Sequence, residues 1–165
     1  MPSNAALKLR PQEFFQGHIQ GWGLFEDFLG NVRREFSVEL HGHKDDDGTV
    51  VLDEKFFYDD GETDERQWRL TIGDDGRVKG TAGDVDGHIQ GSYGGRALNL
   101  AYKLILPMYG RRVGFQVRDR YFLREPGILL NRASLRKVGF KIGDIYATFR
   151  HAEAERDPAV AEAAE

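Results

Sequence analysis

The 165-residue chain contains no cysteine. Disulfides, thiolate nucleophiles, cysteine-ligated metals and cysteine-linked lipids are therefore excluded for the sequence as it stands. No apolar run approaches the ~20 residues that a membrane-spanning helix needs, and the opening MPSNAALKLRP has no apolar signal core. We expect a cytoplasmic protein, or a periplasmic or membrane-associated one if a targeting segment has been removed. The letters SNA would also fit a cloning remnant.

Signatures of nucleic-acid binding and of several enzyme classes are missing as well. The formal net charge is -4, so no net basic field attracts phosphates, and we expect no nucleic-acid partner. No Ser-His-Asp spacing, glycine-rich phosphate loop or HExxH occurs, and nothing calls for a cofactor. Proline is scarce, at 5 residues, whereas glycine reaches 20 and aromatics 12%. This composition favours an all-β chain.

Period-two alternation runs through most of the chain, interrupted by turn signals about every ten residues. A short helix, RPQEFF with Pro11 in its first turn, comes before it. A long meander buries its edges by closing, so we predict an antiparallel up-and-down β-barrel of about ten strands. We expect residues 1–10 to be disordered or cloning-derived, 11–150 to form the barrel and 151–165 to be a disordered tail. The expected strands lie near 18–28, 32–43, 49–58, 63–73, 77–82, 85–93, 96–106, 111–123, 128–138 and 141–150.

Three polar residues fall on the faces that alternation turns inward: Glu54, Asp119 and Asn131. Burying a polar group without a partner costs about 1–3 kcal/mol, so these positions are informative. Folding the hairpins about their turns places Asp119 beside Leu100 and Ala133, and Asn131 beside Tyr121. It places Glu54 opposite Val38 and Trp68.

An interior with two carboxyls, an amide and tyrosines could fix the polar end of an apolar ligand. Asp119 or Glu54 could instead act as an acid or base if burial raised one pKa. A satisfied polar network in a packed barrel that docks a protein partner is the third alternative. The candidate ligand contacts are Glu54, Trp68, Leu100, Tyr102, Leu104, Phe115, Asp119, Tyr121 and Asn131.

Histidines gather at one expected barrel end, where the first hairpin places His18 opposite Gly42, between His41 and His43. Three imidazoles could bind a metal, but parity turns His18 inward if Trp22 points inward, and turns the other two outward. We therefore expect no metal site. The pentapeptide GHIQG occurs at 17–21 and at 87–91. We interpret both copies as strand segments bracketed by glycines that exclude side chains at a bend or close approach.

The short helix followed by GWG at 21–23 resembles the opening of calycin barrels, the lipocalins and fatty-acid-binding proteins. In that family a Gly-x-Trp packs the closed barrel end beneath an arginine from a late strand. The resemblance implies this structural role for Trp22, with Arg132 or Arg150 as the arginine.

A second resemblance covers residues 10–150. The stretches FFQG, WGLFEDFLGNVRREF, FFYDDGETDERQW, GRVKGTAGDVDG, YKLILP and DRYFLREPGILLNRASLRKVG are similar to a bacterial family known as domain of unknown function 3833. Its members are often lipoproteins and are thought to be calycin-like. The lipobox cysteine is absent here, and Arg120-Tyr121 replaces the usual Trp-Met. The residues matching the family's characteristic positions are Glu54, Arg66, Trp68, Asp84, Asp119, Asn131, Arg132 and Lys137.

The resemblance implies a setting, because relatives tend to be encoded beside enzymes that modify membrane fatty acids. We therefore expect a barrel that binds a lipid, fatty acyl chain or similar apolar ligand, and contact with lipid-modifying enzymes. An enzyme acting on such a lipid is the first alternative. An uncovered pair of strands would also allow a homodimer, and the basic stripe at 131–141 could meet anionic lipid head groups.

Overall fold

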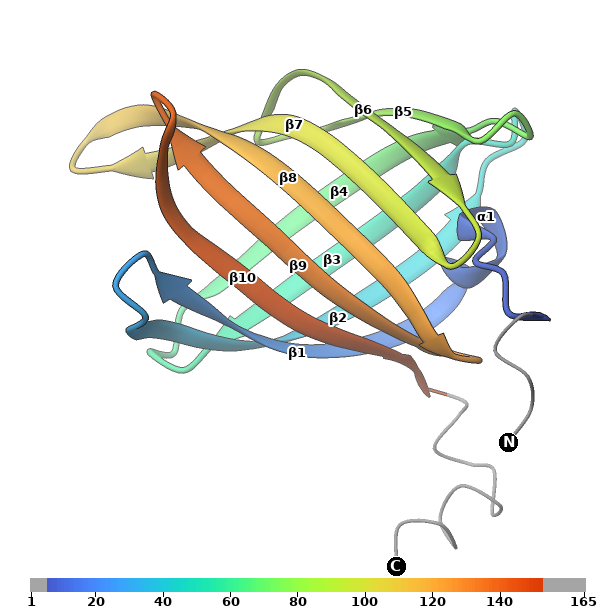
Figure 1. Cartoon of the computed structure of the whole chain (residues 1–165), viewed down its shortest axis with the longest axis horizontal. Coiled ribbons are helices and arrows are strands. Elements are labelled where there is room, and N and C mark those ends of the chain that lie inside the picture. Colours follow the sequence, from blue (N-terminus) through green and yellow to red (C-terminus); the bar gives the residue numbers. More distant parts are fainter. Residues whose placement is uncertain (1–5, 153–165) are drawn as a thin grey trace, which may run out of the picture.

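Ten antiparallel strands close into a barrel in the computed structural model, which describes residues 6–152 (Figure 1). Each strand pairs with the next along the chain, and β1 pairs with β10, so the barrel leaves no free edge. The predicted fold class is confirmed. No helix in the described part of the chain is long and apolar enough to cross a membrane. The strands are β1 (Gly17–Asp27), β2 (Val32–Lys44), β3 (Val50–Tyr58), β4 (Thr63–Ile72), β5 (Arg77–Ala82), β6 (Val85–Gly94), β7 (Ala97–Met108), β8 (Arg111–Glu125), β9 (Ile128–Lys137) and β10 (Phe140–His151).

The meander gives the barrel two different ends. The turns that follow the odd-numbered strands β1 to β9 emerge at one end, which we call the hairpin end. The turns that follow the even-numbered strands lie at the opposite end together with α1 (Pro11–Phe14), and we call this the helix end. In Figure 1 the hairpin end is on the left and α1 on the right.

The helix end is closed by α1 and the residues beside it. Phe14 and Phe15 are buried, and the Phe15 ring lies 6.1 Å from the Tyr121 ring inside the barrel. Leu9 is also buried, and its N–H donates to the Gly95 carbonyl at 2.8 Å. The expectation of disorder up to residue 10 is therefore wrong for the segment around Leu9, because its side chain joins the core. Residues 1–5 and 153–165, including most of the expected tail, lie outside the described residues.

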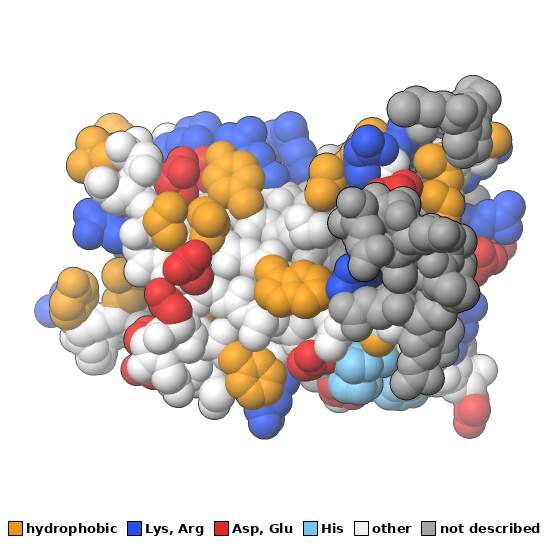
Figure 2. Space-filling view, turned by 90° about the horizontal axis from the view of Figure 1, so that it is seen from below, with side chains coloured by type: hydrophobic (Ala, Val, Ile, Leu, Met, Phe, Trp, Pro, Cys, Tyr) orange, Lys and Arg blue, Asp and Glu red, His pale blue; other side chains and the backbone are white. Residues whose placement is uncertain are grey.

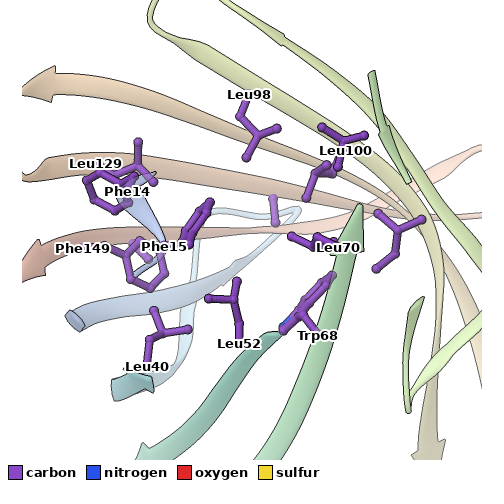
Figure 3. Close-up of a cluster of buried hydrophobic side chains, with 14 of the residues drawn as sticks. Phe14, Phe15, Leu40, Leu52, Trp68, Leu70, Leu98, Leu100, Leu129 and Phe149 are labelled. Carbon is purple, nitrogen blue, oxygen red and sulfur yellow. The ribbon is translucent and has the colours of Figure 1, made fainter. Parts of the chain in front are cut away.

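Alternation along each strand sends apolar side chains into the lumen, as predicted. Figure 3 shows the resulting cluster, in which Phe14 and Phe15 meet side chains from both sides of the barrel. Ile19, Leu40, Leu98 and Leu129 are among its fully buried members. The core therefore lies inside the barrel toward the helix end.

The two GHIQG segments have the same local structure. Each begins with a glycine of positive φ, +79° at Gly17 and +76° at Gly87, and each buries its isoleucine completely. Each ends with an inward glycine, Gly21 or Gly91, at which a Cβ would collide with neighbouring strands. The repeat thus reflects two strands under one constraint, as interpreted from the sequence.

Two expected registers need correction. The structure pairs Glu54 with Leu40 and Arg66, two residues away from the expected partners Val38 and Trp68 on each side. A shift of two keeps every side chain on its face. His18 pairs with His41 and not with Gly42, because the turn pairs Glu26 with Val32 and the bulge after Phe25 then moves the β1–β2 register by one residue only.

We predict that Gly91→Ala lowers the free energy of unfolding by about 1–3 kcal/mol, the usual cost of overpacking. The added methyl would meet the Asn99 carbonyl oxygen and the Leu100 side chain. Gly94→Ala, three residues along the same strand, has open space at its Cβ and serves as the control. Urea unfolding measures both, and equal midpoints would contradict the packing argument.

Candidate ligand site in the barrel lumen

A group of polar and aromatic side chains crosses the lumen between the packed core and the hairpin end. One part comes from β3 and β4 and the other from β7, β8 and β9. The parts meet where the Trp68 and Tyr102 rings approach edge to face, with centroids 5.3 Å apart. We call this group the polar belt, and its members are Glu54, Arg66, Trp68, Tyr102, Asp119, Tyr121 and Asn131.

Asp119 organises one side of the belt. It is 3% exposed and faces Leu100 and Ala133, as the hairpin argument expected. Its Oδ2 accepts hydrogen bonds from the hydroxyls of Tyr102 at 2.9 Å and Tyr121 at 3.0 Å, and its Oδ1 accepts one from the Asn131 amide at 2.6 Å. Three donors satisfy this carboxylate without any ligand.

The pKa values on this side follow from burial. Desolvation raises the pKa of Asp119, and the hydrogen bonds from Asn131 and the two tyrosines oppose that rise. Desolvation and the Asp119 charge raise the pKa of Tyr102 and of Tyr121 well above the ordinary range. Both hydroxyls therefore stay protonated and keep donating to Asp119.

Glu54 and Arg66 form the other side of the belt, directly opposite each other on β3 and β4. Desolvation raises the pKa of Glu54 to about 7, although the Arg66 charge acts in the opposite direction. Arg66 donates to Asp84 at 2.6 Å. Burial alone would lower the pKa of Arg66, but the Glu54 and Asp84 charges outweigh it and raise the pKa. The guanidinium therefore remains a cation inside the barrel.

Three atoms on this side have no hydrogen-bond partner within the described residues: Glu54 Oε2, Arg66 Nε and Trp68 Nε1. The Trp68 indole lies close enough to lower the Glu54 pKa, but the pair lacks good hydrogen-bond geometry. Unpaired buried polar atoms are rare in folded proteins and call for an explanation. Here they come from adjacent strands and face the same interior.

The enclosed space on the helix side of the belt is small. A cavity of about 20 Å³ lies between Phe15, Phe149, Leu40 and the belt residues Glu54 and Trp68. That volume holds about one water molecule. The helix half of the lumen is therefore filled by side chains.

The half of the lumen toward the hairpin end is apolar, and it is less tightly buried on the side of β2 and β3 than around Leu104, Phe115 and Leu135. Inward-facing Phe36, Phe56 and Tyr58 are only half-buried, and neighbouring rings in this group lie 5.5–6.3 Å apart. The Arg34 guanidinium lies 3.5 Å from the Tyr58 ring centroid. Leu106, across the barrel on β7, is half-buried as well. This half could accept an apolar molecule that reaches the polar belt.

The other expected ligand contacts, Leu100, Leu104 and Phe115, are buried on inward faces. The expected contact between Trp22 and an arginine forms with Arg150, but it lies on the outer wall. Trp22 is 47% exposed on the outer wall, where the Arg150 guanidinium lies 5.5 Å from its ring. Arg132 lies on the outer wall too and pairs with Asp144. Gly21 and Gly23 face inward instead, because Phe149 and Phe36 occupy the space beside them.

The three histidines of the expected cluster, His18, His41 and His43, lie outside the lumen. His18 and His41 stack with centroids 4.6 Å apart, and His18 also contacts Glu39. His43 lies 3.5 Å from an Asp45 oxygen. His18 would have turned inward only if Trp22 did, and Trp22 faces outward, so Ile19 takes the inward position. Within residues 6–152 no group of three or more histidine, aspartate or glutamate side chains is placed to hold a metal ion.

Sequence reasoning from alternation missed Arg66, Asp84 and Arg34 as interior residues. The alternation did place the two arginines inward, because Arg66 lies on the same strand face as Trp68 and Leu70. Arg34 likewise lies on the same face as Phe36 and Val38. A charged residue is costly to bury unless it is paired. The partner of Arg66 is Asp84, which lies on a different hairpin.

We predict that Glu54 makes the protein less stable as pH rises from about 4.5 to about 7. In that range the unfolded chain has released the Glu54 proton, whereas the folded state, with a pKa of about 7 against an ordinary 4.5, still holds it. The penalty reaches up to about 3 kcal/mol above pH 7. Glu54→Gln should remove it, and Glu65→Gln, an exposed change on the outer face of β4, should not. Urea unfolding across pH measures the difference, and parallel curves for wild type and Glu54→Gln would contradict this pKa.

Comparison with solved structures identifies barrels of the same fold. The chain superposes on an S-type phycobiliprotein lyase, CPES, from Guillardia theta with a TM-score of 0.61 and 9% identity, covering 90% of this chain and 94% of that one. A protein of unknown function from the DUF3598 family of Nostoc punctiforme gives a TM-score of 0.68 and 14% identity, covering 92% of this chain and 52% of that one. At these identities the likeness shows the fold alone. No curated protein sequence matches the chain.

A family model matches almost the whole described chain. The match runs over residues 2–151 and so includes every strand and every member of the polar belt. This agrees with the resemblance seen in the sequence. The chain therefore belongs to the family described as protein of unknown function DUF3833.

Proposed function

We propose that this protein binds a small apolar molecule, of the fatty acyl kind, in the hairpin half of the barrel lumen. The observation that carries the proposal is the set of unpaired polar atoms on Glu54, Arg66 and Trp68. They lie where the apolar half of the lumen ends. A ligand that hydrogen-bonds them would remove the cost of leaving them unpaired, about 1–3 kcal/mol for each group.

The chemistry of these atoms selects the polar end of the ligand. Trp68 Nε1 and Arg66 Nε are donors, and Glu54 is also a donor when protonated, which its pKa of about 7 allows below neutral pH. Donors that converge on one place favour an acceptor, such as a carbonyl or a carboxylate. Asp119 has its oxygens occupied by three donors, so we assign it to holding the belt in place.

The apolar part of the ligand would lie against the aromatic side chains above the belt. Phe36, Phe56 and Leu106 are inward-facing and only half-buried, so a bound chain would remove apolar surface from water there. The filled helix half, with about 20 Å³ of free space, fixes how deep such a ligand can reach.

We predict that Trp68→Phe weakens binding of a dansyl-labelled fatty acid about tenfold, the effect of one lost hydrogen bond of roughly 1.4 kcal/mol. Trp22→Phe is the matched control, because the sequence has two tryptophans and Trp22 lies on the outer wall. Fluorescence titration measures both affinities. Equal affinities for the two variants, or no saturable binding by the wild type, would contradict the proposal.

An acid–base enzyme acting on the bound molecule is a second candidate, favoured by the Glu54 pKa of about 7. It requires turnover that Glu54→Gln abolishes while binding persists. Lipid mass spectrometry of ligand incubated with the wild type distinguishes the two, since a pure binding protein returns the ligand unchanged.

A further inference from the structure

Large apolar side chains are exposed at three neighbouring turns of the hairpin end. Tyr109 is 98% exposed between β7 and β8, and Phe28 and Leu29 are 66% and 70% exposed between β1 and β2. At the β9–β10 turn Val138 is 85% exposed, and Phe140, the first residue of β10, is 76% exposed. We call these five residues the apolar tips. None of them contributes to the core.

The three turns lie next to one another around the barrel. The strand order runs β2, β1, β10, β9, β8, β7 along this arc. The Phe28 N–H donates to the Ile142 carbonyl at 3.0 Å, which ties the β1–β2 turn to β10. Figure 1 shows the three turns projecting from the same end, and Figure 2 shows hydrophobic and basic side chains at that end, with acidic side chains near them. The tips therefore form one surface.

Two of the tips have a backbone conformation that is energetically unfavourable for their residue types. Tyr109 has φ of 51° and Val138 of 49°, and they are the non-glycine residues with positive φ in the described chain. Each comes first in a two-residue turn completed by a glycine of positive φ, Gly110 or Gly139. Such turns favour asparagine, aspartate or glycine at the first position. A β-branched valine is a genuine outlier there.

The strain at these turns brings no contact within the chain, because both side chains are almost fully exposed. Strained residues persist where they serve a function. A bulky apolar side chain kept at a position that prefers asparagine, and aimed into solvent, indicates an apolar partner outside the barrel.

The charges beside the tips show what kind of partner fits. Five cations and no acid occur in residues 105–114 and 134–143, namely Arg111, Arg112, Arg136, Lys137 and Lys141. Lys141 pairs with Asp144, whereas Arg111 and Arg112 make no ion pair within residues 6–152. Glu26, Asp27 and Asp144 are acids on the arc, where Asp27 pairs with Arg33 and Asp144 with Arg132 and Lys141. Other acids of this end, Asp59, Asp60, Glu62 and Asp84, lie on the β3–β4 and β5–β6 turns, away from the arc.

We propose that the hairpin end docks on the surface of an anionic lipid bilayer. The apolar tips enter the interface between head groups and acyl chains, and the basic side chains of β8 to β10 meet the anionic head groups. The cations beside the β7–β8 and β9–β10 tips oppose pairing with a second copy of the same surface, because they would repel one another. A bilayer presents the apolar layer and the opposite charge together.

The test is flotation of the full chain with phosphatidylcholine vesicles and with vesicles that also contain phosphatidylglycerol. We expect binding to the anionic vesicles that falls with salt. The double variant Tyr109→Asn, Val138→Asn should lose this binding while its melting temperature stays equal or rises, because asparagine tolerates the left-handed conformation. Arg111→Gln with Arg112→Gln should weaken binding on the order of 30-fold, from about 1 kcal/mol for each charge.

Leu130→Thr is the control, since Leu130 is 40% exposed on the barrel wall of β9. It should bind vesicles as the wild type does. Wild-type protein that ignores anionic vesicles, or asparagine variants that bind them fully, would overturn the proposal. So would a concentration-dependent dimer that the same asparagine substitutions disperse, because the tips would then meet a second copy. Vesicle binding needs no lumen ligand, so these results are independent of the fatty-acid titration.

Discussion

The interior of this barrel depends on one buried carboxylate, Asp119. A charge enclosed by apolar side chains is costly unless several donors surround it. The donors here come from three strands: Tyr102 on β7, Tyr121 on β8 itself and Asn131 on β9. The network therefore fixes how these strands present their inner faces. It also places Tyr102 against Trp68, and so links the two sides of the lumen.

The polar belt divides the lumen into two parts with different properties. Toward the helix end, phenylalanines from α1 and β10 fill the space, and this half gives stability. Toward the hairpin end, Leu104, Phe115 and Leu135 are buried, whereas Phe36, Phe56, Tyr58 and Leu106 face inward and are only half-buried. The ligand-binding proposal and the bilayer proposal concern the same end. A molecule that leaves a membrane would enter the lumen there without crossing water.

The strands and their inner faces could be predicted because alternation with period two and glycine-marked turns are local signals. The neighbours of Asp119 were predictable too, since the tight turn sets the β7–β8 register and the bulge between Leu123 and Glu125 gives β8–β9 the register expected from the turn at 125–127. The bulge after Phe25 and the five-residue β2–β3 connection carry no such signal, so the partners of His18 and Glu54 were misplaced. Trp22 faces outward because Gly21 and Gly23 take the inward positions, where Phe149 and Phe36 leave no room for a side chain.

The pairing of Arg66 and the free volume of the lumen could not be predicted from the sequence. Arg66 is neutralised by Asp84 from the β5–β6 turn, a contact between two hairpins whose distance alternation along one strand does not give. The cavity volume depends on how Phe15 and Phe149 pack against side chains from many strands. The left-handed conformations of Tyr109 and Val138 likewise became evident only from the backbone, because the turn signals fix a hairpin and not its strain.

The central claim is that the hairpin half of the lumen holds a small apolar molecule with an acceptor group. Native mass spectrometry of the purified protein, followed by denaturing extraction, tests it most directly. The account predicts a one-to-one complex that yields a fatty acid or related carbonyl compound, either as isolated or after incubation with a fatty-acid mixture. A bare protein mass under both conditions would contradict it.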